Sequence, residues 1–182
     1  ALGLNGPGDA RRRAADLAGV RGSIDAYLED SVLLLLPEAM RDFLLRTSIF
    51  ERLNDRACDA ALGPGASSWM KLDWLERHNV FLRPLDEQRV WFRYHALLQD
   101  ALRRRAAREL ADELPLLHRR ASHWFAAQAL WPEAIRHALA AGDLALAADW
   151  VEAVAGSLLD RGDVGMVLGL LAWLPQPLIR LR

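Results

Sequence analysis

The sequence predicts a mainly α-helical protein in which a winged-helix domain with one β-hairpin precedes tetratricopeptide-like helical hairpins. Three observations lead to this prediction. Apolar residues recur at three- and four-residue spacing along most of the chain, which indicates amphipathic helices. One stretch, Val80 to Tyr94, has instead the β-branched and aromatic composition of a hairpin. From His95 onward the helical spacing returns, and it falls into pairs joined by Gly-Asp turns.

Composition limits the classes of protein to which the chain can belong. Its 182 residues are 52% hydrophobic, enough to bury a core, and the net charge of −1 disfavours a nucleic-acid binder. The single cysteine, Cys58, excludes an internal disulfide and fits a reducing cytoplasm. The longest apolar run, Val164 to Pro175, is shorter than the ~18 residues needed to span a bilayer. We therefore expect a cytoplasmic protein with no membrane partner.

Two helices are expected after a linker at the start of the chain. Residues 1–22 hold five of the twelve glycines, which is typical of a linker or a frayed domain end. After Ser23, a suitable N-cap, helical spacing continues until Pro37, which stops one helix and can start the next. The second helix carries Met40, Phe43 and Leu44 on its apolar face.

Two further helices and the hairpin complete the predicted winged-helix domain. One helix runs from an Asn54 cap to about Leu62, and another is capped by Ser67 or Ser68. Two apolar runs, from Val80 to Leu85 and from Val90 to Tyr94, flank a polar turn and predict the hairpin. Because Pro84 cannot donate a ladder hydrogen bond, we expect it on an outer edge.

The remainder of the chain predicts a helix from His95 and then two helix pairs. The pairs run from about Leu116 to Gln128 with Pro132 to Ala141, and from Leu144 to Leu159 with Val164 to Leu174. Ala121 and Phe125 followed by Pro132 match part of the tetratricopeptide pattern. Two pairs are fewer than a solenoid needs, so we expect the truncated start of an array.

No catalytic or metal-ligating constellation is predicted. Lys71, the one lysine, follows Met70 rather than a glycine, so the phosphate-binding P-loop motif is absent from this sequence. The five histidines lack a metal-binding spacing, and His118 and His123 lie on different helix faces. We interpret Cys58 as a small buried hydrophobe. The chain itself is therefore expected not to be an enzyme.

Two segments could bind nucleic acid, and both have an alternative explanation. In a winged helix the element before the wing, here Ser67 to His78, often enters the major groove. This helix is neutral and apolar, so we predict that it is buried in protein contacts. The basic run Arg103 to Arg108 is closely followed by acidic residues and is interpreted as a solvated face. A stand-alone winged-helix DNA-binding protein stays as the alternative function.

His95 is the candidate site residue. It follows the second hairpin strand and opens the next helix, where its ring and the free backbone N–H groups could meet an anion such as a phosphate. The alternative is that His95 only caps the helix.

Six ordered blocks of the sequence resemble a known family: Phe43 to Ser48, Cys58 to Leu62, Leu75 to Leu82, Trp91 to His95, His118 to Phe125 and Glu133 to Asp143. Together they look like the middle of the large MalT-like, LuxR-type transcriptional activators, which belong to the signal-transduction ATPases with numerous domains. The likeness covers the chain from about Ile24 to Leu174. It includes the signature around His95, although Leu98 stands where many relatives have phenylalanine.

The resemblance implies a multidomain switch. Such proteins combine an N-terminal P-loop ATPase, a winged helix, a superhelical sensor that binds a small-molecule inducer, and a C-terminal helix-turn-helix that binds DNA. The chain then divides into residues 1–22, the linker or tail of the ATPase region, 23–106, the winged helix, and 107–182, the start of the sensor. No cofactor is expected in this segment, whereas the parent protein would bind ATP and ADP as a slow regulatory ATPase.

The resemblance also gives His95 a role. In related switches, a histidine opening the last winged-helix helix contacts the β-phosphate of ADP, and His95 is at the matching position. The chain would thus be an internal relay whose partners are its own ATPase domain and sensor repeats.

Overall fold

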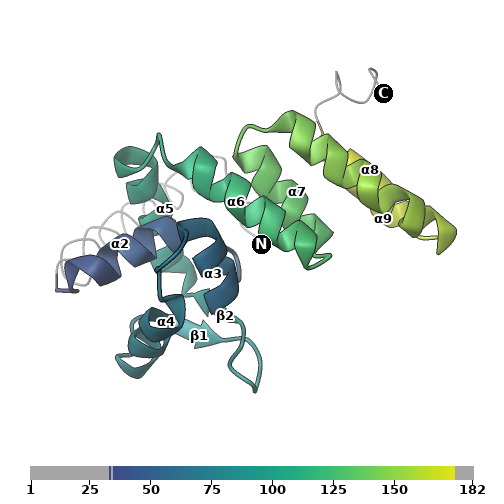
Figure 1. The fold of residues 1–182 in the computed structure, drawn as a ribbon. Coiled ribbons are helices and arrows are strands. Elements are labelled where there is room, and N and C mark those ends of the chain that lie inside the picture. Colours follow the sequence, from purple (N-terminus) through teal and green to yellow (C-terminus); the bar gives the residue numbers. More distant parts are fainter. Residues whose placement is uncertain (1–32, 34, 175–182) are drawn as a thin grey trace, which may run out of the picture.

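The computed structural model describes Leu33 and residues 35–174, and within them it contains eight helices and a two-stranded antiparallel sheet. The hairpin lies at the edge of a group of short helices with its turn projecting from them, and the later helices extend from this group to one side (Figure 1). The predicted mainly helical fold with one hairpin is confirmed. The predicted linker over residues 1–22 and most of the helix expected after Ser23 lie outside the described residues.

The winged-helix part consists of α2 (Glu38–Thr47), α3 (Asp55–Leu62), α4 (Ser68–Arg77), β1 (Leu82–Pro84), β2 (Phe92–Tyr94) and α5 (Ala96–Glu109). The Asn54 side chain accepts a hydrogen bond from the Ala57 N–H, as predicted, and Gly63 ends α3 with φ at +97°. Ser67 has a left-handed φ of +52°, and its hydroxyl makes no cap. Ser67 thus stands at the predicted N-cap position, but the serine hydroxyl does not form the cap, because the Asp59 carboxylate of α3 accepts from the Ser68 N–H at 3.0 Å instead.

The hairpin pairs Leu82 with Tyr94 and Pro84 with Phe92. On its other side, Phe92 exchanges both backbone hydrogen bonds with Leu53, at 2.8 and 2.9 Å. β2 is therefore flanked on both sides and β1 is an outer strand, which confirms the edge position predicted for Pro84. The Asp86 carboxylate closes the turn by accepting from two backbone N–H groups.

The two predicted helix pairs are α6 (Leu114–Ala127) with α7 (Trp131–Ala140), and α8 (Leu144–Asp160) with α9 (Val164–Leu171). Gly142 and Gly162 stand in the predicted turns with φ of +73° and +75°. Asp143 caps α8 by accepting from the Leu146 N–H. Asp163 makes no such side-chain bond, so the second turn has only the glycine half of the predicted motif.

Two apolar clusters form the interior. The first includes buried residues of every winged-helix element and continues without interruption into α6 and α7 through Leu117, Phe125 and Ala134. The second joins α7 to α8 and α9. The predicted division after residue 106 falls inside α5, and the core passes across it.

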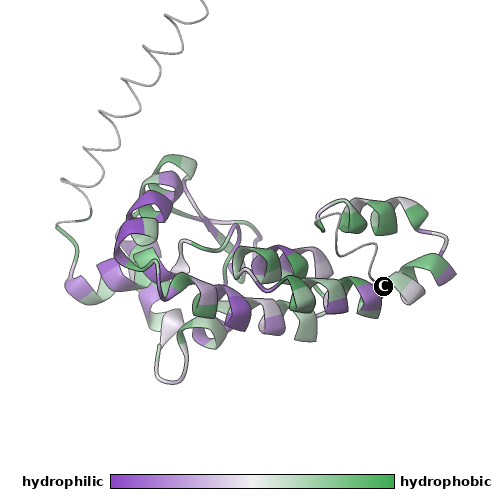
Figure 2. Cartoon of the chain, turned by 90° about the horizontal axis from the view of Figure 1, so that it is seen from above, coloured by the Kyte–Doolittle hydropathy of each residue, from purple (hydrophilic) through white to green (hydrophobic). Residues whose placement is uncertain are grey.

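Hydropathy varies along the described part of the chain. Polar and apolar residues alternate around the winged-helix elements, whereas α9 contains only apolar residues and glycine (Figure 2). Among the described helices, none is long and apolar enough to cross a membrane.

Candidate functional site

His95 is exposed at the junction between β2 and α5. Its backbone N–H donates to the Phe81 carbonyl at 2.8 Å, and its carbonyl accepts the first bond of α5 from the Gln99 N–H. The imidazole makes no capping hydrogen bond, so the side-chain cap that stood as the alternative is not formed. The ring is free to contact a ligand beside the helix N-terminus, where backbone N–H groups and the helix dipole favour an anion.

The segment next to His95 has an unusual backbone. Asn79 and Phe81 both have a left-handed φ, +52° and +50°, which is costly for an aromatic residue. The partly exposed ring of Phe81 lies 6.2 Å from the His95 ring, centroid to centroid. Since strained residues cluster at functional sites, this strain marks the junction as a candidate site.

The solvent face of the hairpin adds positive charge there. Arg83 and Arg93 stand directly opposite each other in the register, and both are exposed. Like charges in such a cross-strand pair repel, and the Nε of Arg93 donates to the Glu51 carbonyl at 3.2 Å. Strand alternation puts Arg93 on the same side as His95, two residues later.

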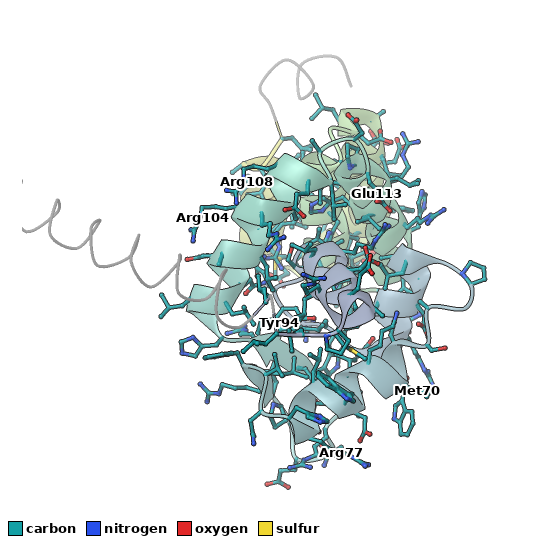
Figure 3. The ribbon with its side chains drawn as sticks, turned by 90° about the vertical axis from the view of Figure 1, so that its left-hand side faces the viewer. Met70, Arg77, Tyr94, Arg104, Arg108 and Glu113 are labelled. Carbon is teal, nitrogen blue, oxygen red and sulfur yellow. The ribbon has the colours of Figure 1, made fainter. Side chains whose placement is uncertain are left out.

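The helix α4 does not have the surface of a groove-reading helix. Arg77 pairs with Asp73 at 3.1 Å, and Arg89 of the turn pairs with Glu76 at 3.5 Å. Trp69 and Met70 are 64% and 65% exposed, and Met70 and Arg77 lie at the surface in Figure 3. The prediction that this helix is buried in protein contacts is wrong for these two residues, because α4 buries only its Leu72 and Leu75 face.

The basic run on α5 is divided between two environments. Arg103 donates from Nε to the Ser48 carbonyl at 2.9 Å, so it turns toward the loop after α2. Arg105 forms an ion pair with Glu109 at 2.7 Å, as expected of a solvated face. Arg104 and Arg108 are exposed and point away from the body of the molecule (Figure 3).

The other candidate residues of the sequence lie apart from His95. Cys58 is completely buried, which raises the pKa of its thiol well above the usual value and agrees with its predicted role as a small hydrophobe. Among the described residues, His, Cys, Asp and Glu side chains form no group of three that could hold a metal ion.

Sequence reasoning missed a histidine pair. His118 of α6 and His137 of α7 approach to 2.8 Å between their Nδ1 atoms. Burial lowers the pKa of His118 to about 4 and that of His137 to about 3, with nearby arginines adding to both shifts and the neighbouring His118 adding to that of His137. No local pattern could have revealed the pair, because the two residues lie 19 positions apart on different helices.

The pair borders a pocket of about 340 Å³ between the winged-helix part and the first helix pair. Two ion pairs cross this boundary on the pocket wall: Arg52 with Glu133, at 2.5 Å from Nη2, and Arg136 with Glu51. The hydrogen bond from Arg136 lowers the pKa of the Glu51 carboxyl.

Comparison with known proteins agrees with this architecture. Residues 28–114 match the MalT winged helix domain family. The chain is 37% identical over 167 residues to the HTH-type transcriptional regulator MalT of Klebsiella pneumoniae (strain 342), a match that covers 91% of this chain and 18% of that protein. It is 36% identical over 179 residues to the serine/threonine-protein kinase PknK of Mycobacterium tuberculosis (strain CDC 1551 / Oshkosh), covering 98% of this chain and 16% of that protein. The chain thus spans less than a fifth of each relative.

Proposed function

We propose that this chain, which belongs to the MalT winged helix family, is the internal relay of an inducer- and ATP-dependent regulator. The relay couples a nucleotide-binding domain to a helical-repeat sensor. The observation that carries the proposal is the uncommitted ring of His95 at the start of α5, beside the strained Phe81 and on the same face as Arg93.

The residues present fit a nucleotide phosphate. The imidazole can donate a hydrogen bond, the first N–H groups of α5 have no partner within the helix, and Arg93 adds positive charge. In the parent protein, ADP held partly by His95 favours the closed resting state, while inducer and ATP favour an open state. We expect no catalytic group in the segment itself, and we propose that the parent is a slow regulatory ATPase of the cytoplasm.

The two relatives suggest which output the relay serves. The regulator MalT is named for a helix-turn-helix, which would supply the DNA contact outside this segment, whereas PknK is named as a protein kinase. A relay that senses nucleotide on one side and repeats on the other is compatible with either output. We favour transcription regulation because the family match is to the MalT winged helix.

The relay is tested by His95→Ala in the full-length protein. Loss of one hydrogen bond to a charged phosphate should accelerate ADP release about tenfold and raise inducer-independent output. Release of a fluorescent ADP analogue and a transcription reporter measure the two effects. His123→Ala, which removes an exposed histidine of α6, is the matched control. Unchanged ADP release together with unchanged basal output would remove His95 from the mechanism.

The isolated 182-residue chain is expected to bind no nucleotide appreciably, because it lacks a P-loop. Calorimetric titration with ADP checks this, and a micromolar dissociation constant would contradict it.

The alternative, a stand-alone DNA-binding winged helix, is disfavoured by the ion-paired charges of α4. A gel shift that weakens steeply with added salt would support that alternative instead.

A further inference from the structure

We propose that the pocket between the winged-helix part and the first helix pair binds a small oxyanion, a carboxylate or a phosphoryl group, with Arg103 as its charged anchor. The proposal is independent of the nucleotide contact, because His95 does not line this pocket. The pocket volume of about 340 Å³ lies within the roughly 300 to 1,000 Å³ typical of ligand sites.

The charges on the wall leave one cation in excess. Five charged side chains line the pocket: Glu51, Arg52, Arg103, Glu133 and Arg136. Each of the two carboxylates is already hydrogen-bonded to an arginine, Glu133 to Arg52 and Glu51 to Arg136. Arg103 is the third cation, and its charge also helps to lower the pKa of Glu51. Its Nε bond to the Ser48 carbonyl orients the guanidinium, and we assign its terminal N–H groups to the bound oxyanion.

A buried donor of α7 beside the pocket also has no acceptor. The Nε atom of Arg136 is inaccessible to solvent and makes no hydrogen bond within the described residues. Such a donor costs free energy, and a small shift of the Arg136 side chain toward an anion in the pocket would supply its partner. Arg103 comes from α5 and Arg136 from α7, so a bound anion would connect the two parts of the molecule.

The remaining wall suits the rest of a small ligand. His118 and His137 are uncharged near neutral pH and share one Nδ1 proton, which leaves one Nε2–H on the accepting ring. Ile49, Leu114 and Phe125 supply apolar surface. A charged anchor, a few polar groups and an apolar wall are the usual composition of a small-molecule site.

The test is a titration of the 182-residue chain with inorganic phosphate and, separately, with benzoate, at constant ionic strength maintained with chloride. The ring C–H signals of His118 and His137 report binding by NMR. We expect saturable chemical-shift changes with at least one probe. Tighter binding of phosphate would indicate a phosphorylated ligand, and tighter binding of benzoate would indicate a carboxylate ligand. Arg103→Gln should weaken binding at least tenfold, whereas Arg161→Gln, which removes an exposed arginine after α8, should leave it within twofold.

Three results would overturn the proposal: no saturable shift with either probe, equal affinity in Arg103→Gln, or an equal loss in Arg161→Gln. If Arg103→Gln does not fold, Arg103→Lys replaces it. That variant keeps the positive charge but lacks the paired N–H groups of the guanidinium, so it should bind the anion severalfold more weakly. If neither probe shifts the NMR signals of the two histidines in the unmodified chain, that result alone overturns the proposal.

Discussion

At the scale of single residues, Tyr94 shows how one polar group fixes the hairpin on the helices. Its hydroxyl lies 2.7 Å from Oγ1 of Thr47, which itself donates to the Phe43 carbonyl at 2.6 Å. Tyr94 is therefore the donor in this pair. Burial raises the pKa of Tyr94 well above its usual value, so the hydroxyl keeps its proton near neutral pH.

Tyr94→Phe should lower the free energy of unfolding by about 1 kcal/mol, because one buried hydrogen bond is lost while the ring still fills its place. Urea denaturation measures the change. In a double-mutant cycle with Thr47→Val, the two substitutions should cost less together than the sum of the single changes. Additive costs would show that the two hydroxyls do not interact.

The pair His118 and His137 predicts a dependence of stability on pH. Both pKa values are lowered in the folded chain, to about 4 and about 3, from an ordinary value of 6.5. The unfolded chain therefore binds more protons below pH 6.5, and stability falls as the pH drops from 6.5 toward 4. A single histidine shifted this far costs about 2 kcal/mol between pH 7 and pH 5.

The measurement is the free energy of unfolding between pH 5 and pH 7. His137→Gln should remove a large part of the pH dependence, because the buried imidazole is gone. Glu51 and Asp143 titrate below this window, since their pKa values are lowered from 4.5 and 3.8 by arginine and backbone partners. An unchanged slope in His137→Gln would assign the pH dependence to other groups.

At the scale of elements, local signals determined most of what the sequence predicted correctly. The Asn54 cap, the Pro37 start and the glycine turns depend on neighbours within a few residues, so a linear pattern contains them. The cap of α4 depends on Asp59, which belongs to another helix. A pattern along the chain could not reveal that partner.

Two glycines give opposite expectations for the same substitution. Gly142 has a φ of +73°, so Gly142→Ala should destabilise the chain by about 1 kcal/mol through backbone strain alone. Gly156 lies inside α8 with open space around its α-carbon, so Gly156→Ala should stabilise by about 0.5 to 1 kcal/mol. Urea denaturation of both variants checks the pair. The same sign for both would refute the conformational argument.

At the scale of the whole molecule, the two apolar clusters should separate in stability. The first joins the winged-helix elements to α6 and α7, while the second holds α8 and α9. We expect the amide hydrogens of α2 to α7 to exchange only through global unfolding. Those of α8 and α9 should exchange through a local opening with a lower free energy. Native-state hydrogen exchange measures this difference.

A matched pair of substitutions tests this division. Leu117→Ala in the first cluster should cost about 2 to 5 kcal/mol throughout the molecule. Leu158→Ala in the second should accelerate exchange in α8 and α9 and leave α2 to α5 nearly unchanged. Equal acceleration of exchange everywhere by both variants would indicate one cooperative unit.

The sequence by itself determined the helix order, the single hairpin, the edge position of Pro84 and the position of His95 before α5, because each follows from periodicity, turn chemistry or a short motif. Only the tertiary structure decided that Trp69 and Met70 are exposed, that His118 meets His137, and that Arg103 and Arg136 line one pocket. The physical reason is the range of the interactions. Periodicity indicates which face of a helix is apolar. Which residues contact that face, and which groups pair with each buried charge, depends on how segments far apart in the chain pack together.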